Sequence, residues 1–269
     1  MNLKSVLPAA VACKLRTARE LAEDLRRTEE DRVFATACPA LDRLLSGGLQ
    51  RGGMVELVGR RSSGRFSLVN AVLAAVTGSG ETAALVDLGD GFDPQAAETA
   101  GVDLERLLWA RPRHLKEVLA SAEAILRSGM PLVVIDLGMP PLAGGRGAEA
   151  SWLRLARAAQ GHRAALLVAS PYRVSGTSAQ SVLEVRASST DWLGRGAAPR
   201  LLCGVAARLS LVKSRAVHRP GDVRPSAGDV EELLLRMAED LRDGPQDGAV
   251  EDTFEEVAAP EEQQWRIAS

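Results

Sequence analysis

Length, composition and charge limit the classes of protein that this chain can represent. Its 269 residues are enough for one large α/β domain with short extensions or for two small domains. Apolar residues make up 46% and aromatic residues only 3%, so we expect an aliphatic core, typical of sheets covered by helices, and no surface for stacking rings against bases.

The net charge of −2 is distributed unevenly along the chain. Residues 229–269 hold 13 acidic residues and three arginines, and residues 1–228 hold 22 acidic and 30 basic residues, a net charge of +8. A basic body with an acidic tail indicates an anionic partner, with the tail as competitor or regulator. A tail that only aids solubility fits the same pattern.

The cysteines and the lack of a long apolar run limit the cellular compartment in which we expect the protein. Cys13, Cys38 and Cys203 lie far apart, so neither a disulfide framework nor a zinc site is expected. No apolar run reaches the roughly 18 residues of a membrane span, and the apolar patch at 6–12 lacks the cleavage site of a signal peptide. We expect a cytoplasmic, nucleoid-associated protein with no membrane partner.

The first predicted element is a charged amphipathic helix over residues 13–31, whose apolar stripe fits core packing and partner binding equally well. Next come a short helix over 39–45, with Thr36 as its cap, a strand at 54–58, a loop at 59–64 and a helix at 65–76. Further strands are expected at 83–87, 132–136 and 164–169, with helices at 94–100, 114–128 and 149–160. This alternation, with strands that have no polar face, predicts an α/β fold with a mostly parallel central sheet flanked by helices.

After residue 170 the pattern changes. Strands at 182–187 and 207–213 without long helices between them predict an antiparallel extension at one edge of the sheet. A final helix is predicted over 229–241 because Val230, Leu233, Leu234 and Met237 recur at helical spacing. We therefore divide the chain into an N-terminal helix (1–33), a core (34–228), and a C-terminal helix with an acidic, disordered tail (229–269).

The loop between the strand at 54–58 and the helix at 65–76 matches part of the phosphate-binding pattern G-x-x-x-x-G-K-[ST]. The matching residues are Gly59, Arg60, Arg61, Ser62, Ser63, Gly64, Arg65, Phe66 and Ser67. Both glycines that let backbone N–H groups converge on an anion are present. Arg65 replaces the lysine, and Phe66 replaces the hydroxyl that ligates Mg²⁺. Ser67 is one residue late and points about 100° away on a helix.

Asp136 ends an apolar strand, as expected of a second Mg²⁺-site carboxylate; a residue that caps the strand end would look the same.

Three stretches in the same order resemble RecA-type recombinases over roughly residues 34–220. They are ALDRLLSGGLQRGGMVELVGRRSSGRFSL, AALVDLGDGFDPQAAETAGVDLERLLWARP and ARLSLVKSRAVHRPG. The resemblance implies a RecA-like P-loop fold for the core.

The resemblance also implies that the catalytic positions are altered. In the family, a glutamate two residues beyond the aspartate of the second strand orients the attacking water. Counting from Asp87 reaches Gly89, and the neighbouring Asp90 is shorter and shifted. Losing one such group typically costs a factor of ~10² to 10⁴ in rate. We therefore expect no catalytic residue, no bound metal ion and at most weak binding of ATP.

The segments that contact DNA or a neighbouring subunit in the family are altered or retained in part. Both DNA-contacting loops are short here, and the candidate contacts, which solvated side chains would resemble, are Arg146, Arg154, Arg157 and Arg173. Lys213 and Arg215 match a basic pair that reaches across a subunit interface in the family; a basic strand end on the surface is the alternative.

Within the superfamily the chain resembles ImuA-type proteins, accessory factors of damage-induced mutagenesis. The resemblance implies a non-catalytic or weakly nucleotide-binding accessory protein in DNA repair, the SOS response and translesion synthesis. Its expected partners are RecA or a RecA-like neighbour, an ImuB-like polymerase homologue and an error-prone polymerase, with DNA as a further candidate. The alternatives are a divergent DNA-dependent ATPase, in which Arg65 and Asp90 supply the missing groups, and a SulA-type cell-division inhibitor, whose family lacks the glycines kept here.

Overall fold

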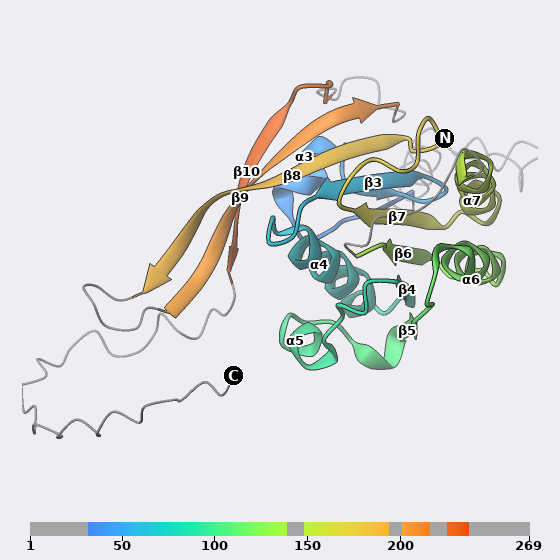
Figure 1. Cartoon of the computed structure of the whole chain (residues 1–269), viewed down its shortest axis with the longest axis horizontal. Helices are drawn as coiled ribbons and strands as arrows, with labels where there is room; N and C mark the ends of the chain where they lie inside the picture. The colour runs from blue at the N-terminus through green and yellow to red at the C-terminus, as the bar shows by residue number, and fades with distance from the viewer. Residues whose placement is uncertain (1–31, 139–147, 194–200, 216–224, 237–269) are drawn as a thin grey trace, which may run out of the picture. The chain divides into compact units, whose positions relative to one another are not determined.

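The computed structural model describes residues 32–138, 148–193, 201–215 and 225–236. An eight-stranded sheet lies at its centre, in the order β10-β9-β8-β3-β7-β6-β4-β5 (Figure 1). Its parallel strands are β3 (Met54–Gly59), β4 (Ala83–Asp87), β5 (Leu107–Ala110), β6 (Leu132–Asp136), β7 (Ala165–Ser170) and β8 (Ser181–Leu193). Two antiparallel strands, β9 (Leu201–Ser214) and β10 (Val230–Arg236), extend one edge. The predicted α/β fold class, with its mostly parallel sheet and antiparallel extension, is confirmed.

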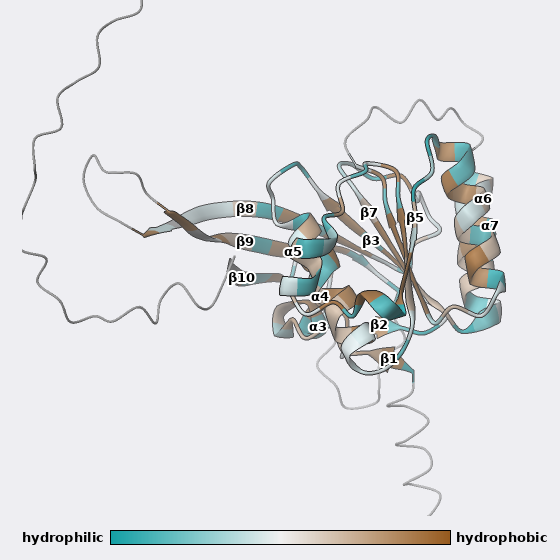
Figure 2. Ribbon diagram, turned by 90° about the horizontal axis from the view of Figure 1, so that it is seen from below, coloured by the Kyte–Doolittle hydropathy of each residue, from teal (hydrophilic) through white to brown (hydrophobic). Residues whose placement is uncertain are grey.

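Helices cover both faces of the sheet (Figure 2). On one face lie α3 (Pro39–Leu44), α4 (Arg65–Gly78) and α5 (Pro94–Thr99), and on the other α6 (Leu115–Arg127) and α7 (Ala148–His162). Each face of the sheet packs against its helices in a separate hydrophobic core, and alternate residues of β3 point into one core or the other. Leu57 belongs to the core on the side of α3, α4 and α5, whereas Met54 and Val58 belong to the core on the side of α6 and α7. Because both faces are covered, β3, β4, β6 and β7 are buried throughout, which is why their sequences are apolar without a polar face.

Smaller elements complete the described part. A two-stranded sheet pairs β1 (Val33–Phe34) with β2 (Leu49–Gln50), and a 3-10 turn, η2 (Leu104–Arg106), precedes β5. The sequence did not predict β5, an edge strand that is only partly buried. Among the described residues, no helix is long and apolar enough to cross a membrane.

The helix predicted over 229–241 is wrong for residues 230–236, which form β10. Seven residues pair with β9, from Val230 opposite Ser210 to Arg236 opposite Gly204. The free edge of β9 satisfies the backbone groups of this segment, and this tertiary contact overrides the helical spacing of its leucines. Leu233 packs against the core, and Glu231 forms an ion pair with Arg43 of α3.

The predicted cap of the short helix is also wrong. Cys38, not Thr36, is the N-cap residue of α3, and its side chain makes no capping hydrogen bond. Thr36 instead donates to Asp42 from its N–H at 3.0 Å and from its hydroxyl at 2.8 Å. The chain entering α3 is therefore fixed by a side chain of the helix itself.

Strands β8 and β9 are longer than predicted and extend beyond the body of the sheet (Figure 1). Val185 pairs with Gly59, the last residue of β3, and β8 then continues for eight residues to Leu193 with β9 as its partner. The predicted helix at 13–31, the residues before Arg32 and the acidic tail after Arg236 lie outside the described residues.

Candidate functional site

The phosphate-type loop lies where the sequence predicts it, between β3 and α4. Gly64 is the N-cap of α4 with a left-handed φ of 91°, and Ser62 has a left-handed φ of 58°. Gly59 is required by space, because a Cβ there would lie 2.4 Å from Cγ1 of Val185 and 2.5 Å from Oγ of Ser63. The loop therefore has the curvature of an anion-binding loop at a helix N-terminus.

The side chain of Arg65 points back into its own loop. Its guanidinium donates to the carbonyl oxygens of Gly59 (2.7 Å) and Gly138 (3.1 Å) and forms an ion pair with Asp136 at 3.3 Å. Only 8% of the Arg65 side chain and 4% of the Asp136 side chain are exposed. The cation that replaces the phosphate-binding lysine is therefore already neutralised by the carboxylate expected to serve Mg²⁺.

Burial decides the electrostatics of this pair. Burial, together with the negative charge of the nearby Asp87, raises the pKa of Asp136 to about 6 against the opposing effect of the Arg65 charge. Burial also lowers the pKa of Arg65, although Asp136 acts in the opposite direction. Burial therefore makes each charged group unfavourable in free energy on its own, and each is stabilised by the opposite charge of its partner.

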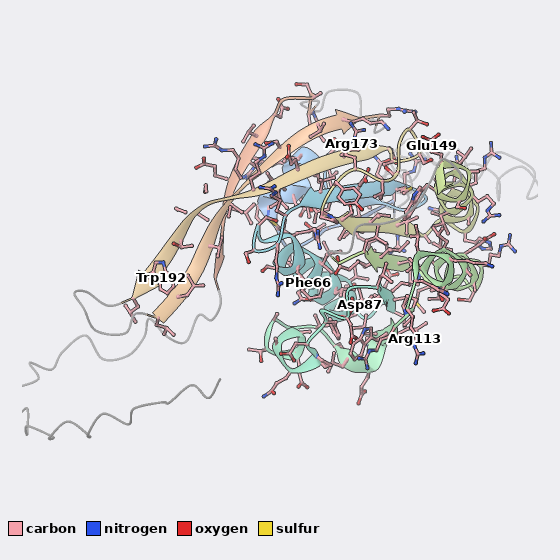
Figure 3. The ribbon with its side chains drawn as sticks, viewed as in Figure 1. Phe66, Asp87, Arg113, Glu149, Arg173 and Trp192 are labelled. Atoms are coloured by element: carbon pink, nitrogen blue, oxygen red, sulfur yellow. The ribbon has the colours of Figure 1, made fainter. Side chains whose placement is uncertain are left out.

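Phe66 and Ser67 complete the hollow that would hold a nucleotide phosphate, which we call the cradle. The cradle has a volume of about 430 Å³, and its lining includes Gly64, Arg65, Phe66, Ser67, Gly89 and Asp136. Phe66 lies on the first turn of α4 and packs against the core of that face, while Ser67 is exposed (Figure 3). A phenyl ring offers no oxygen to a metal ion, so the residues present do not fit a Mg²⁺–nucleotide complex.

The position of the family's water-orienting glutamate is filled by backbone. A Cβ on Gly89 would lie 2.6 Å from the Cα of Gly138, so a larger residue would require a shift of the loop after β6. The shifted Asp90 does not line the cradle, because it makes a two-bond ion pair with Arg111 at 2.7 and 2.8 Å. Asp87 accepts from the N–H groups of Gly91 and Phe92 and so holds the loop that follows β4 (Figure 3).

The candidate DNA contacts are not brought together. Arg146 lies outside the described residues. Arg154 and Arg157 are exposed on α7, and Arg154 lies 3.8 Å from Glu123 of α6. Arg173 is exposed in the loop after β7 (Figure 3).

Lys213 lies near the end of β9, where it pairs with Val182 close to the start of β8, and Arg215 follows the last residue of the strand. The Lys213 ammonium donates to the carbonyl oxygens of Thr177 (3.2 Å) and Ala179 (2.7 Å), and Arg215 also donates to Thr177 (3.1 Å). Burial lowers the pKa of Lys213, and the positive charges of Arg215 and Arg173 lower it further. The charge of Arg173, a candidate DNA contact, thus acts on Lys213 of the predicted interface pair.

Glu56 is a residue that the sequence interpretation missed. It is fully buried in the middle of β3 and accepts from the N–H groups of Val174 and Ser175 and from the Ser175 hydroxyl. The sequence did contain a sign of its role, because it is the single acidic residue in an otherwise apolar strand. A carboxylate buried in a sheet that is covered on both faces needs hydrogen-bond donors from elsewhere in the chain. Here the loop after β7 supplies them. In the described part of the chain, no group of three or more His, Cys, Asp and Glu side chains is arranged to hold a metal ion.

Comparison with known proteins finds similarity to RecA over the part of the chain that holds this site. Residues 21–141 match the RecA N-terminal domain. Protein RecA of Clostridium acetobutylicum is 38% identical over 106 residues, which cover 39% of this chain and 30% of that protein. The corresponding figures are 40% over 106 residues (39% and 31%) for Protein RecA of Chlorobaculum tepidum and 39% over 115 residues (42% and 33%) for that of Methylococcus capsulatus. The match therefore spans about a third of the length of these curated relatives.

Proposed function

This chain is RecA-like over the segment that carries the phosphate-type loop and Asp136, and from this we propose that it is an accessory protein in DNA repair and damage-induced translesion synthesis. In this proposal the RecA-like core binds nucleotide weakly or not at all and does not hydrolyse it. Its role is to hold other repair proteins together.

The buried Arg65–Asp136 pair carries the proposal. A hydrolytic site needs its cation free for phosphate and its carboxylate free for the metal ion. Here the two groups form an ion pair with each other at 3.3 Å and are almost fully buried. A nucleotide would have to break this pair and also displace the bonds of Arg65 to two carbonyl oxygens.

Two further observations support the loss of hydrolysis. Phe66 provides no oxygen for Mg²⁺, and the backbone of Gly138 fills the space beside Gly89. Together with the Arg65–Asp136 pair, these changes concern three separate roles, namely phosphate binding, metal binding and orientation of the water.

An ATPase assay tests the non-catalytic part of the proposal. The full chain with Mg²⁺, ATP and single-stranded DNA is expected to release phosphate no faster than a protein-free blank, with an active RecA protein as positive control. Turnover well above the blank that disappears in Arg65→Ala would contradict the proposal and favour the divergent ATPase.

Affinity purification from DNA-damaged cells tests the accessory part. We expect an ImuB-like polymerase homologue, an error-prone polymerase or RecA to be retained by the tagged chain. Recovery of cell-division proteins without any of these would instead indicate the SulA-type function.

A further inference from the structure

Strands β8 and β9 continue past the end of β3 and form an arm that extends beyond the rest of the sheet (Figure 1). Val185 is the last residue of β8 that pairs with β3, and from Arg186 onward the described residues give β8 no neighbouring strand other than β9. One edge of β8 is therefore unpaired along the arm. A two-stranded ribbon is only marginally stable in water by itself, and an unpaired edge readily accepts another strand.

Apolar side chains gather at the end of this arm, which we call the arm tip. Trp192, Leu193 and Leu201 are 48%, 50% and 45% exposed, and Leu193 pairs with Leu201 across the ribbon. The indole N–H of Trp192 donates to the Thr190 hydroxyl at 2.8 Å, so the polar atom of the ring is already satisfied within the arm (Figure 3). The tip thus presents an apolar surface that another protein surface could remove from water.

A hollow lies at the other end of the same edge, where β8 leaves β3. We call it the β8 hollow; it has a volume of about 530 Å³, and its lining residues are 58–63, Pro171 and 184–187. The partly or fully exposed side chains of this lining include Pro171 and Ala187 as well as Arg60 and Arg61. Apolar groups beside guanidinium groups suit an aromatic ring, because the face of the ring attracts cations.

We propose that a second copy of this chain fills the β8 hollow with its arm tip, in a two-fold dimer whose β8 strands lie antiparallel along their unpaired edges. In such a pair with its axis near Ser189, Trp192 of each copy lies beside Arg186 of the other, at the hollow. Both tips then reach both hollows at once. The contact uses the same surface on the two copies and therefore closes as a dimer without forming a filament.

The arrangement of the edge is the reason for choosing a second copy as the partner. A different protein would have to match the hollow or the tip separately, whereas a second copy carries both at the spacing that antiparallel pairing requires. A bulge between Ala187 and Ser189 interrupts the middle of the edge, so its two ends determine the fit. The carboxylate of the hollow, Glu184, accepts from Arg186 at 2.9 and 2.7 Å, and its negative charge is thus balanced where the ring arrives.

The dimer goes beyond the proposed function and does not depend on it. It uses neither Arg65 nor Asp136, so an active ATPase could form the same dimer. For an accessory protein, the dimer would join two RecA-like cores in one assembly.

Sedimentation velocity of the full chain between 1 and 200 µM tests the proposal. Trp192→Ser combined with Leu193→Ser removes the arm tip, and Ala187→Phe fills the hollow from an exposed residue of β8. Val212→Ser combined with Val230→Ser is the matched control, because these residues are 40% and 49% exposed on β9 and β10, away from the tip and the hollow.

We expect the native chain to dimerise in the micromolar range. The tip variant and Ala187→Phe are each expected to weaken dimerisation at least about 10-fold, and the control to change it less than about 2-fold. An equimolar mixture of the tip variant and Ala187→Phe is expected to associate more tightly than either alone, because the two chains together form one complete contact of tip and hollow. The melting temperatures should stay close to the native value, since the changed side chains are exposed.

Four results would overturn the proposal. A native chain that stays monomeric at 200 µM would leave the arm tip to a different protein, and assemblies larger than a dimer would exclude the closed two-fold contact. Equal weakening by the tip variant and the control would show that the tip has no special role. Native association of Ala187→Phe would indicate that the two tips contact each other and leave the hollow empty.

Discussion

The buried pair of Arg65 and Asp136 predicts an unusual pH dependence when the cation is removed. In Arg65→Met the methionine keeps the apolar stem, but the carboxylate loses the nearby positive charge that opposes the effect of burial on its pKa. Its pKa is therefore expected to rise above the value of about 6 that it has in the native chain.

The magnitude follows from burial. Breaking a buried pair by removing one partner typically costs about 3–5 kcal/mol, because an unpaired charge remains. Asp136 can avoid this penalty by taking up a proton, and then the remaining loss comes from the carbonyl oxygens of Gly59 and Gly138, about 1–3 kcal/mol. A carboxyl group whose folded pKa is raised contributes stability at low pH that is lost as the pH rises through that pKa. The deficit of Arg65→Met relative to the native chain is thus expected to grow between pH 6 and pH 7.5.

Urea unfolding at pH 6, 6.75 and 7.5 measures this deficit directly. Arg111→Met is the matched control, because it removes an arginine from the exposed pair with Asp90. Arg111 lowers the pKa of Asp90, so that pair loses stability only at acidic pH and its deficit is expected to stay constant over this range. A deficit of Arg65→Met that is equally large at all three pH values would refute the reasoning.

Three further predictions concern other parts of the chain. Glu56→Gln replaces a buried acceptor of three donors with a group that brings its own N–H, so we expect a loss of about 1–3 kcal/mol in unfolding free energy, whereas Ser175→Ala, which leaves the two backbone donors in place, is expected to cost less. Lys213→Glu combined with Arg215→Glu is expected to reduce the amount of RecA recovered in a pull-down, and unchanged recovery would argue against the interface prediction. Deleting residues 243–269 is expected to strengthen DNA binding in a salt titration, and an identical titration would leave the tail with a solubilising role alone.

Several parts of the fold were predictable because their signals are local. A strand covered on both faces must be apolar along its whole length, and β4 and β6 begin and end where the sequence predicts. The glycines of the phosphate-type loop were equally informative, since the turn from β3 into α4 needs a left-handed residue at position 64.

The predictions were wrong where one sequence pattern fits two kinds of secondary structure. The leucines after Val230 fit a helix stripe or a strand, and the choice was made by the unpaired edge of β9, which contributes hydrogen bonds along seven residues. The edge strand β5 escaped prediction for a related reason, because it is short and only partly buried.

By itself, the sequence determined that a mostly parallel sheet carries a phosphate-type loop without the usual lysine and metal-binding hydroxyl. Only the tertiary structure decided what the replacements do: Arg65 meets Asp136, and Asp90 turns to Arg111. The physical reason is that backbone conformation and burial follow short-range patterns. Which partner a charged side chain finds depends instead on the order of the strands, which brings the end of β6 and the first residue of α4 together across 71 residues of sequence.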